Sequence, residues 1–374
     1  MIVVLGAGLI GLGIACELAC RGEPVRVLET GETGRGASWA GAGMLAPGTE
    51  GVASGPFGDL CRDSLRRYPE FVARLRDEGG IDARLRLDGI LDVAFDEPGE
   101  RRLAARVRDE RAAGADVEAF DARRAREVEP ELAPGARAAV LARGEGAVDN
   151  RRLGRALDAA ARALGVRIET GVGSVALEAD GRRALGVRTD LGFVGADAVV
   201  NALGAWAGAL VGVPPEAAIP VVPVKGQMLA IAAPLGGLAR TTWVPGAYLV
   251  PRDDGRLLVG ATVEPAAGFD LRVTAGAIRA LLDAALAAVP GLAERSVAET
   301  WAGLRPGTPD GEPYLGATTL ANYVVAAGHY RNGILLAPAT AVGIADLLLG
   351  VPRPDLAPFS PARAREPAAA NLPA

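Results

Sequence analysis

The chain has 374 residues, half of them hydrophobic and 23% charged, which is the composition of a folded globular protein long enough for two domains. The formal net charge of −5 excludes a basic nucleic-acid-binding surface, and the single histidine, His329, excludes histidine-based metal clusters, so we expect no metal site. The three cysteines give no disulfide framework, which favours a reducing, cytoplasmic location.

The first 20 residues are apolar, but Glu17 and several glycines interrupt them. A membrane span needs about 20 uninterrupted apolar residues. We therefore expect a buried strand and a buried helix here, and no membrane association.

The strongest local signal is a glycine-rich turn between a strand and a helix. Residues 2–5 predict a buried parallel strand, and Gly6-Ala7-Gly8-Leu9-Ile10-Gly11 follows at once. The helix closes at Gly22, and a second strand, residues 25–28, ends at Glu29. This order of elements, with an acid 18 residues after Gly11, predicts a dinucleotide-binding unit.

Each residue of this pattern has a physical role. Gly6 permits the tight turn, Gly8 lets the backbone approach a pyrophosphate, and Gly11 lets the helix pack closely on the strand. Leu9 and Ile10 lie at the helix N-terminus, which offers amides and a positive dipole end to phosphates. Glu29 is suited to the adenosine ribose hydroxyls and repels a 2′-phosphate, which argues against NADP. The pattern alone leaves NAD and FAD open.

The next segment, residues 33–45, is rich in small residues and contains Trp39, Met44 and Leu45. Its small residues would let the backbone run beside a flat ring system, whereas a surface loop is the alternative. Large apolar side chains are poor choices for a solvated loop.

The rest of the chain predicts a mixed α/β pattern. Expected helices are 60–78 with Asp59 as N-cap, charged surface helices over 100–131, a helix capped by Asn150, and helices at 275–289 and 338–349. Expected strands lie within 85–95, 166–169, 175–178, 193–200, 221–262 and 322–326.

Four segments carry a resemblance to a known family. They are Ser38–Pro47, the run Tyr248–Arg252 with Gly255–Thr262, Trp301–Pro306, and Gly328–Pro338. With them, the chain resembles the D-amino-acid oxidase-like flavoprotein amine oxidases, and within these the glycine oxidases of thiamine biosynthesis, over nearly its whole length.

The resemblance implies an α/β (α+β) fold of the D-amino-acid oxidase and glutathione reductase type. A Rossmann-like FAD-binding domain would comprise residues 1–80, 140–215 and 300–374. An antiparallel-sheet substrate domain would comprise residues 81–139 and 216–299. The implied cofactor is non-covalent FAD, and the chain has no cysteine after Cys61 to attach a flavin covalently.

The resemblance also implies site residues. Arg331 falls on the substrate-carboxylate arginine, and Tyr248 and Arg305 fall on further substrate positions. Val263 stands where larger residues can line the pocket. Besides Gly6 to Gly11 and Glu29, the implied cofactor-binding residues are Ser38, Ala40, Gly43, Met44, Val172, Gly204, His329, Arg331, Asn332, Gly333, Ile334 and Leu335.

Residue chemistry alone supports Arg331, because a planar, permanently charged guanidinium suits a carboxylate. A surface arginine is the alternative in this arginine-rich chain, and Tyr248 could be a core tyrosine. For His329 we favour a structural or cofactor-adjacent role over a general base, since hydride loss from a neutral amine needs no base at Cα. For Lys225, the only lysine, we favour a structural role over tuning of oxygen reactivity.

The expected function is oxidative deamination of glycine, sarcosine or small D-amino acids. Hydride transfer to flavin N5 would give an imine, which hydrolyses or feeds thiazole synthesis, and oxygen would give hydrogen peroxide. Alternatives are an FAD-dependent D-amino acid dehydrogenase with another electron acceptor, a non-catalytic FAD-binding subunit, and an NAD-linked reductase. The expected partners are a small amine and oxygen, and a homo-oligomer is left open.

Overall fold

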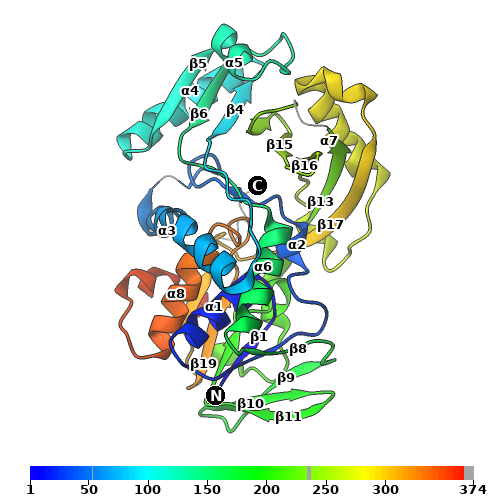
Figure 1. Ribbon diagram of the computed structural model, residues 1–374. Helices are drawn as coiled ribbons and strands as arrows, with labels where there is room; N and C mark the ends of the chain where they lie inside the picture. Colours follow the sequence, from blue (N-terminus) through cyan, green and yellow to red (C-terminus); the bar gives the residue numbers. More distant parts are fainter. Residues whose placement is uncertain (53, 234–236, 366–374) are drawn as a thin grey trace.

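The computed structural model describes residues 1–52, 54–233 and 237–365. Two large sheets organise it (Figure 1). A six-stranded sheet with its helices lies at the end that holds the N-terminus, and an eight-stranded sheet lies at the other end.

The six-stranded sheet is parallel apart from one edge strand. Its order is β18 (Tyr314–Ala317), β19 (Tyr323–Ala327), β12 (Ala198–Asn201), β1 (Ile2–Leu5), β2 (Val25–Leu28) and β8 (Arg167–Glu169). Only β18 runs antiparallel to its neighbour. Four helices pack together over one face: α1 (Leu9–Cys20), α3 (Gly55–Gly79), α6 (Asn150–Ala163) and α8 (Ala337–Leu348).

Strand β1 is buried along its whole length because both faces of this sheet are covered. Ile2 and Val4 belong to the core shared with the helices. Val3 and Leu5 point the other way, into a core shared with a three-stranded antiparallel sheet. That sheet consists of β9 (Val175–Ala179), β10 (Ala184–Thr189) and β11 (Gly192–Gly195). The predicted strand–turn–helix–strand unit is therefore confirmed.

The eight-stranded sheet is antiparallel except between β14 and β4. Its order is β17 (Val297–Gly307), β13 (Val222–Ala232), β16 (Arg256–Gly260), β15 (Ala247–Pro251), β14 (Thr241–Val244), β4 (Ile90–Ala94), β6 (Ala138–Ala142) and β5 (Val117–Asp121). Helix α7 (Ala275–Ala288) packs on one face through Leu281 and Ala285. The opposite face presents Met228 and Trp301 toward Ala40.

Smaller elements accompany the two large sheets. Helices α4 (Glu97–Ala112) and α5 (Ala122–Val128) accompany β4, β5 and β6. A short helix, α2 (Ala37–Ala40), and a two-stranded sheet of β3 (Met44–Leu45) and β7 (Gly146–Ala147) lie between the large sheets. Segment 33–45 is thus structured, and not a plain loop.

Three local predictions are wrong. Helix α3 begins at Gly55 after Ser54, with Pro56 in its first turn, and Asp59 instead pairs with Arg62. The stretch 100–131 contains strand β5 between its helices.

The third error concerns the cap of α6. Asp149, and not Asn150, is the N-cap, because its carboxylate accepts the Arg152 backbone N–H at 2.9 Å. Asn150 is the first helical residue, and its side chain is used elsewhere.

The predicted domain boundaries remain a prediction, and strand pairing bears on them at two places. Both β6 and β17 pair within the eight-stranded sheet, so residues 138–142 and 297–307 lie with the substrate-side sheet. Residues 366–374, predicted to belong to the FAD domain, lie outside the described residues. Among the described helices, none is long and apolar enough to cross a membrane.

Candidate active site

A cavity of about 780 Å³ lies between the two large sheets. One part is lined by Gly6, Gly8 and Glu29, at the carboxyl ends of β1 and β2. The other part is lined by Tyr248, from the eight-stranded sheet, and by loop residue Arg331. Its size suits an organic ligand, and its position at the carboxyl edge of a parallel sheet is typical of cofactor sites.

The glycine-rich turn forms the first part of the cavity. Gly6 has a φ of +96°, which other residues rarely adopt. A Cβ at Gly11 would overlap the Gly6 carbonyl oxygen, so only glycine lets α1 approach β1 this closely. Gly8, Leu9 and Ile10 therefore bring the start of α1 to the cavity wall. This cradle fits a dinucleotide pyrophosphate.

Glu29 follows β2 and is tied to the same turn. Its carboxylate accepts the backbone N–H of Ala7 and of Gly31, each at 2.8 Å. The side chain is half-buried and lines the cavity. A carboxylate held here is suited to ribose hydroxyls, and this role remains a prediction.

Most of the other predicted cofactor-binding residues also line the cavity: Ser38, Ala40, Gly43, Met44, Gly204, His329, Arg331, Gly333 and Ile334. Among the residues that the structure describes, Gly11, Val172, Asn332 and Leu335 are not part of its lining. The backbone N–H and C=O of Val172 bond to Glu29 and Asp190, and Val175 lines the cavity instead.

The segment around α2 runs along the cavity and is held from both sheets. Asn150 donates its side-chain amide to the carbonyls of Ser38 (2.7 Å) and Trp39 (3.1 Å). The Trp301 indole N–H donates to the Ala40 carbonyl at 2.9 Å. Sequence reasoning gave neither contact, because each joins positions more than 100 residues apart.

A buried arginine adds a second brace. The Arg252 guanidinium donates to the carbonyls of Ala42 (2.9 Å) and Val148 (3.0 Å) and to the Asn150 side chain (2.8 Å). Burial lowers its pKa to about 10, so it still carries its charge at neutral pH. The brace fixes the backbone that faces the cavity.

Three predicted substrate residues meet in the other part of the cavity, namely Tyr248, Arg305 and Arg331. The Arg305 guanidinium is braced by the carbonyls of Thr262 (3.0 Å) and Lys225 (3.5 Å). Among the described residues, the Arg331 guanidinium has no hydrogen-bond partner, and it lies 5.4 Å from the Tyr330 ring centre. Its donors are therefore available to a ligand.

Glycines make room for two of these side chains. A Cβ at Gly260 would lie 2.6 Å from the Tyr248 hydroxyl oxygen. A Cβ at Gly226 would lie 2.7 Å from the Cζ atom of Arg305. Burial raises the pKa of Tyr248, so its hydroxyl stays protonated and can donate at neutral pH.

Sequence reasoning missed Glu50, which lines the same part of the cavity. Withdrawal from water raises the pKa of its carboxyl to about 7, against the opposing influence of the Arg331 and Arg305 charges. The preceding turn is fixed by Glu145, which accepts the backbone N–H groups of Gly48 (2.6 Å) and Thr49 (3.2 Å). Glu50 adds a titratable negative charge beside two guanidiniums.

His329 is buried, and its Nε2 lies 3.1 Å from the Thr340 hydroxyl. Burial lowers its pKa to about 3, so the imidazole is neutral near pH 7. This environment fits a structural or cofactor-adjacent residue.

Comparison with known proteins adds a family relationship. The FAD dependent oxidoreductase (DAO) family matches residues 1–347. A glycine oxidase of Pseudomonas aeruginosa is 38% identical over 366 residues, which cover 96% of this chain and 98% of that protein. The bifunctional protein ThiO/ThiG of Synechocystis is 39% identical over 369 residues, but the chain spans only 54% of its length.

Solved structures agree with this relationship. The crystal structure of glycine oxidase from Geobacillus kaustophilus superposes with a TM-score of 0.92 at 37% identity, covering 97% of this chain and 98% of that one. L-proline dehydrogenase from P. horikoshii has a TM-score of 0.86 at 24% identity, which supports the fold alone.

Proposed function

The chain belongs to the FAD dependent oxidoreductase family, and from that premise we propose that it oxidises glycine and other small amines or amino acids. One observation carries the choice of substrate. Tyr248, Arg305 and Arg331 meet in a cavity whose other part carries the dinucleotide-binding turn. Two guanidiniums and a hydroxyl donor suit a carboxylate.

FAD fits the described residues. Gly6 and Gly8 with the start of α1 would hold the pyrophosphate, and Glu29 would hold the adenosine ribose. The braced segment from Ser38 to Met44 would lie beside the flavin ring. When bound, FAD supplies the acceptor for the hydride that leaves the substrate Cα.

The remaining chemistry belongs to the protein's own side chains. Arg331 offers a planar pair of N–H donors to the substrate carboxylate, and Arg305 and the Tyr248 hydroxyl offer further donors. Glu50 supplies the negative charge that a substrate ammonium would pair with. Together these groups would orient a small zwitterion, and its neutral-amine form would lose the hydride without a base at Cα.

The product is an imine, which hydrolyses in water. The similarity to a ThiO/ThiG protein supports a place for this product in thiamine biosynthesis. Oxygen as the second substrate, giving hydrogen peroxide, remains part of the proposal, and a dehydrogenase with another electron acceptor is the alternative.

Anaerobic mixing of the FAD-loaded protein with glycine tests the proposal. We expect the oxidised-flavin absorbance to bleach, and we expect peroxide in proportion to glycine consumed when air is admitted. Bleaching without peroxide would indicate a different electron acceptor. A flavin that neither glycine nor any other small amine reduces would contradict the proposed oxidase and favour a non-catalytic FAD-binding subunit.

Arg331→Ala tests the carboxylate contact. We expect KM for glycine to rise by about 30-fold to 5,000-fold, because losing one partner of a buried charge pair costs about 2–5 kcal/mol. Arg331→Lys should recover only part of this, since an ammonium cannot make the two-bond fork. An amine without a carboxylate, such as ethylamine, should be affected little. Equal losses for both substrates would instead assign Arg331 to the flavin or the fold.

A further inference from the structure

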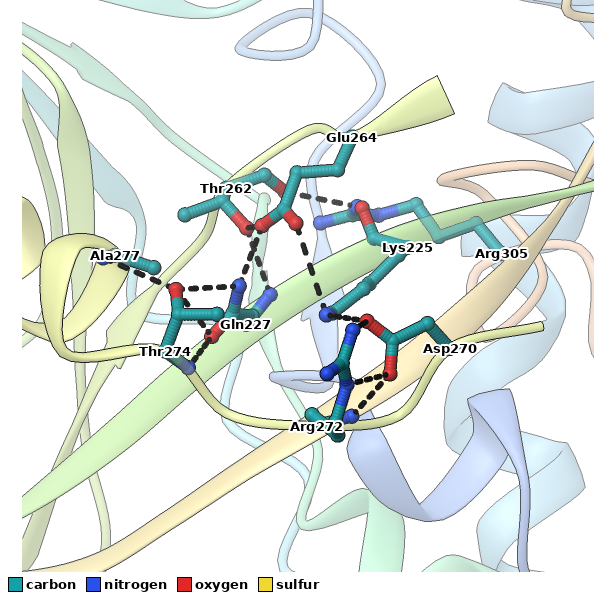
Figure 2. A network of polar contacts seen from close by, with 9 residues as sticks. All are labelled: Lys225, Gln227, Thr262, Glu264, Asp270, Arg272, Thr274, Ala277 and Arg305. Atoms are coloured by element: carbon teal, nitrogen blue, oxygen red, sulfur yellow. Dashed lines mark hydrogen bonds and ion pairs between the residues drawn. The ribbon is translucent and has the colours of Figure 1, made fainter. Parts of the chain in front are cut away.

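An ion-pair network surrounds a buried lysine next to Arg305, one of the residues that line the cavity (Figure 2). At its centre is Lys225 on β13, the only lysine in the sequence, with 1% of its surface exposed. Its ammonium lies 3.2 Å from the Asp270 carboxylate and 3.8 Å from that of Glu264. Both acids belong to the segment of residues 262–272, which follows β16 and which we call the wall segment.

The wall segment is joined to β13 by its backbone as well. The Glu264 backbone N–H donates to the Lys225 carbonyl at 2.9 Å, and the Lys225 backbone N–H donates to the Glu264 carbonyl at 3.3 Å. Gln227, two positions further along β13, is also buried. Its side-chain amide donates to the Glu264 carboxylate at 2.7 Å, and its backbone N–H donates to the Thr262 hydroxyl at 2.9 Å. The segment therefore has one defined position against the strand.

This position determines where Arg305 lies. The Arg305 guanidinium donates to the Thr262 carbonyl at 3.0 Å, and Thr262 is the first residue of the wall segment. Its other brace is the Lys225 carbonyl itself, at 3.5 Å. Displacement of the wall segment would move the carbonyl that holds the guanidinium.

The wall segment also borders the cavity directly. Val263 lines it, and Phe269, next to Asp270, stacks on Trp206 with ring centres 5.6 Å apart. Trp206 lies in η1 (Gly204–Ala209) and also lines the cavity. The Lys225–Asp270 pair thus anchors the part of the wall segment that packs on the cavity-lining Trp206.

We propose that Lys225 is a positioning residue for substrate binding: through Asp270 it holds the wall segment in place, so that the Thr262 carbonyl fixes the Arg305 guanidinium. This rests on the proposed function, in which Arg305 contacts the substrate carboxylate. Lys225 itself does not line the cavity among the described residues, so its influence on substrate passes through the wall segment, whose Thr262 carbonyl holds Arg305.

Two variants and a matched control test this role. Lys225→Met keeps the length of the side chain and removes the charge, and Asp270→Asn removes the partner at a partly exposed position, where folding is less at risk. Arg272→Met is the control, because Arg272 is 87% exposed and pairs with the same Asp270 from the solvent side. Arg305→Ala sets the upper limit of the effect.

We expect KM for glycine to rise about 10-fold to 100-fold in Lys225→Met and Asp270→Asn, because displacing a binding group by about 1 Å can cost about 100-fold. The limiting rate kcat, the affinity for FAD and the oxidation of ethylamine should change little, and Arg272→Met should resemble the unaltered protein. A general structural defect would lower all of these together, and that result would overturn the proposal. So would an unchanged glycine KM in Asp270→Asn.

A binding measurement separates this proposal from the proposed function. Glycolate carries the carboxylate but no amine, and its binding can be followed by the spectrum of the bound flavin without turnover. If glycine does not reduce the unaltered protein, the proposed function fails. Weaker glycolate binding in Lys225→Met, Asp270→Asn and Arg305→Ala alike would still support the positioning role, and unchanged binding in the first two would refute it.

Discussion

Replacing Gly226 by alanine is a sharp test of how the strand supports Arg305. The Gly226 Cβ would come nearest to Nη1 of Arg305 and would lie 2.7 Å from both its Cζ and its Nη2, whereas an ordinary contact begins near 3.4 Å. The guanidinium must therefore retreat by about 1 Å. Gly226 lies within β13 and does not have a positive φ, so the backbone tolerates alanine.

The expected loss follows from that displacement. Misplacing a binding group by about 1 Å can cost about 100-fold, so we expect KM for glycine to rise about 10-fold to 100-fold, or about 1.4–2.8 kcal/mol. Stability should change little, because the obstructing atoms are the end of a flexible side chain.

Steady-state kinetics with glycine and with ethylamine provide the assay. Gly276→Ala in α7 is the matched control, since a Cβ there meets nothing within 4 Å and should leave KM unchanged. If Gly226→Ala raised KM for both substrates alike, the new methyl group would be filling the cavity. If it left glycine KM unchanged, Arg305 would not be a substrate ligand.

Two other substitutions test the proposed FAD-binding residue Glu29 and the buried acid Glu145. Glu29→Ala should weaken FAD binding by about 1–3 kcal/mol without changing the reduction rate at saturating FAD, and an unchanged FAD dissociation constant would exclude Glu29 as the ribose ligand. Burial raises the pKa of Glu145 from 4.5 to about 7, so the folded state holds this proton more tightly than the unfolded state and stability falls as pH rises through that window. We therefore expect the free energy of unfolding, measured with urea, to fall between pH 5 and pH 8. The fall should be about 2–3 kcal/mol smaller in Glu145→Gln than in the unaltered protein. Parallel pH profiles for the two proteins would contradict a buried, protonated Glu145.

The sequence predicts the dinucleotide-binding unit well because its signals are local. Strand, turn, helix and second strand follow one another within 29 residues, and each is indicated by its own periodicity or glycine. The predicted cap of α6 is one residue too late because Asp149 and Asn150 are both residue types that cap helices well. The Asn150 side chain is bound to the distant carbonyls of Ser38 and Trp39, so the Asp149 carboxylate caps the helix.

The proposed substrate part of the cavity is harder to predict from the sequence. Tyr248, Arg305 and Arg331 come from the family resemblance, and their meeting in one cavity depends on the pairing of β13 with β16 and β17. Glu50 follows no periodic pattern, and its importance arises from two guanidiniums more than 250 positions away. Such contacts are properties of the folded chain.

The braces on α2 have a consequence for building hybrid enzymes. Trp301 and Arg252 come from the eight-stranded sheet or its adjoining turn, yet they hold the carbonyls of Ala40 and Ala42 near the N-terminus. A chimera that takes its substrate sheet from a relative would have to take residues 37–44 from the same donor, or restore both donors by substitution. Recombination breakpoints placed before residue 37 would keep residues 37–44 together with the sheet that holds them, whereas breakpoints between residue 45 and β4 would combine this segment with a foreign sheet.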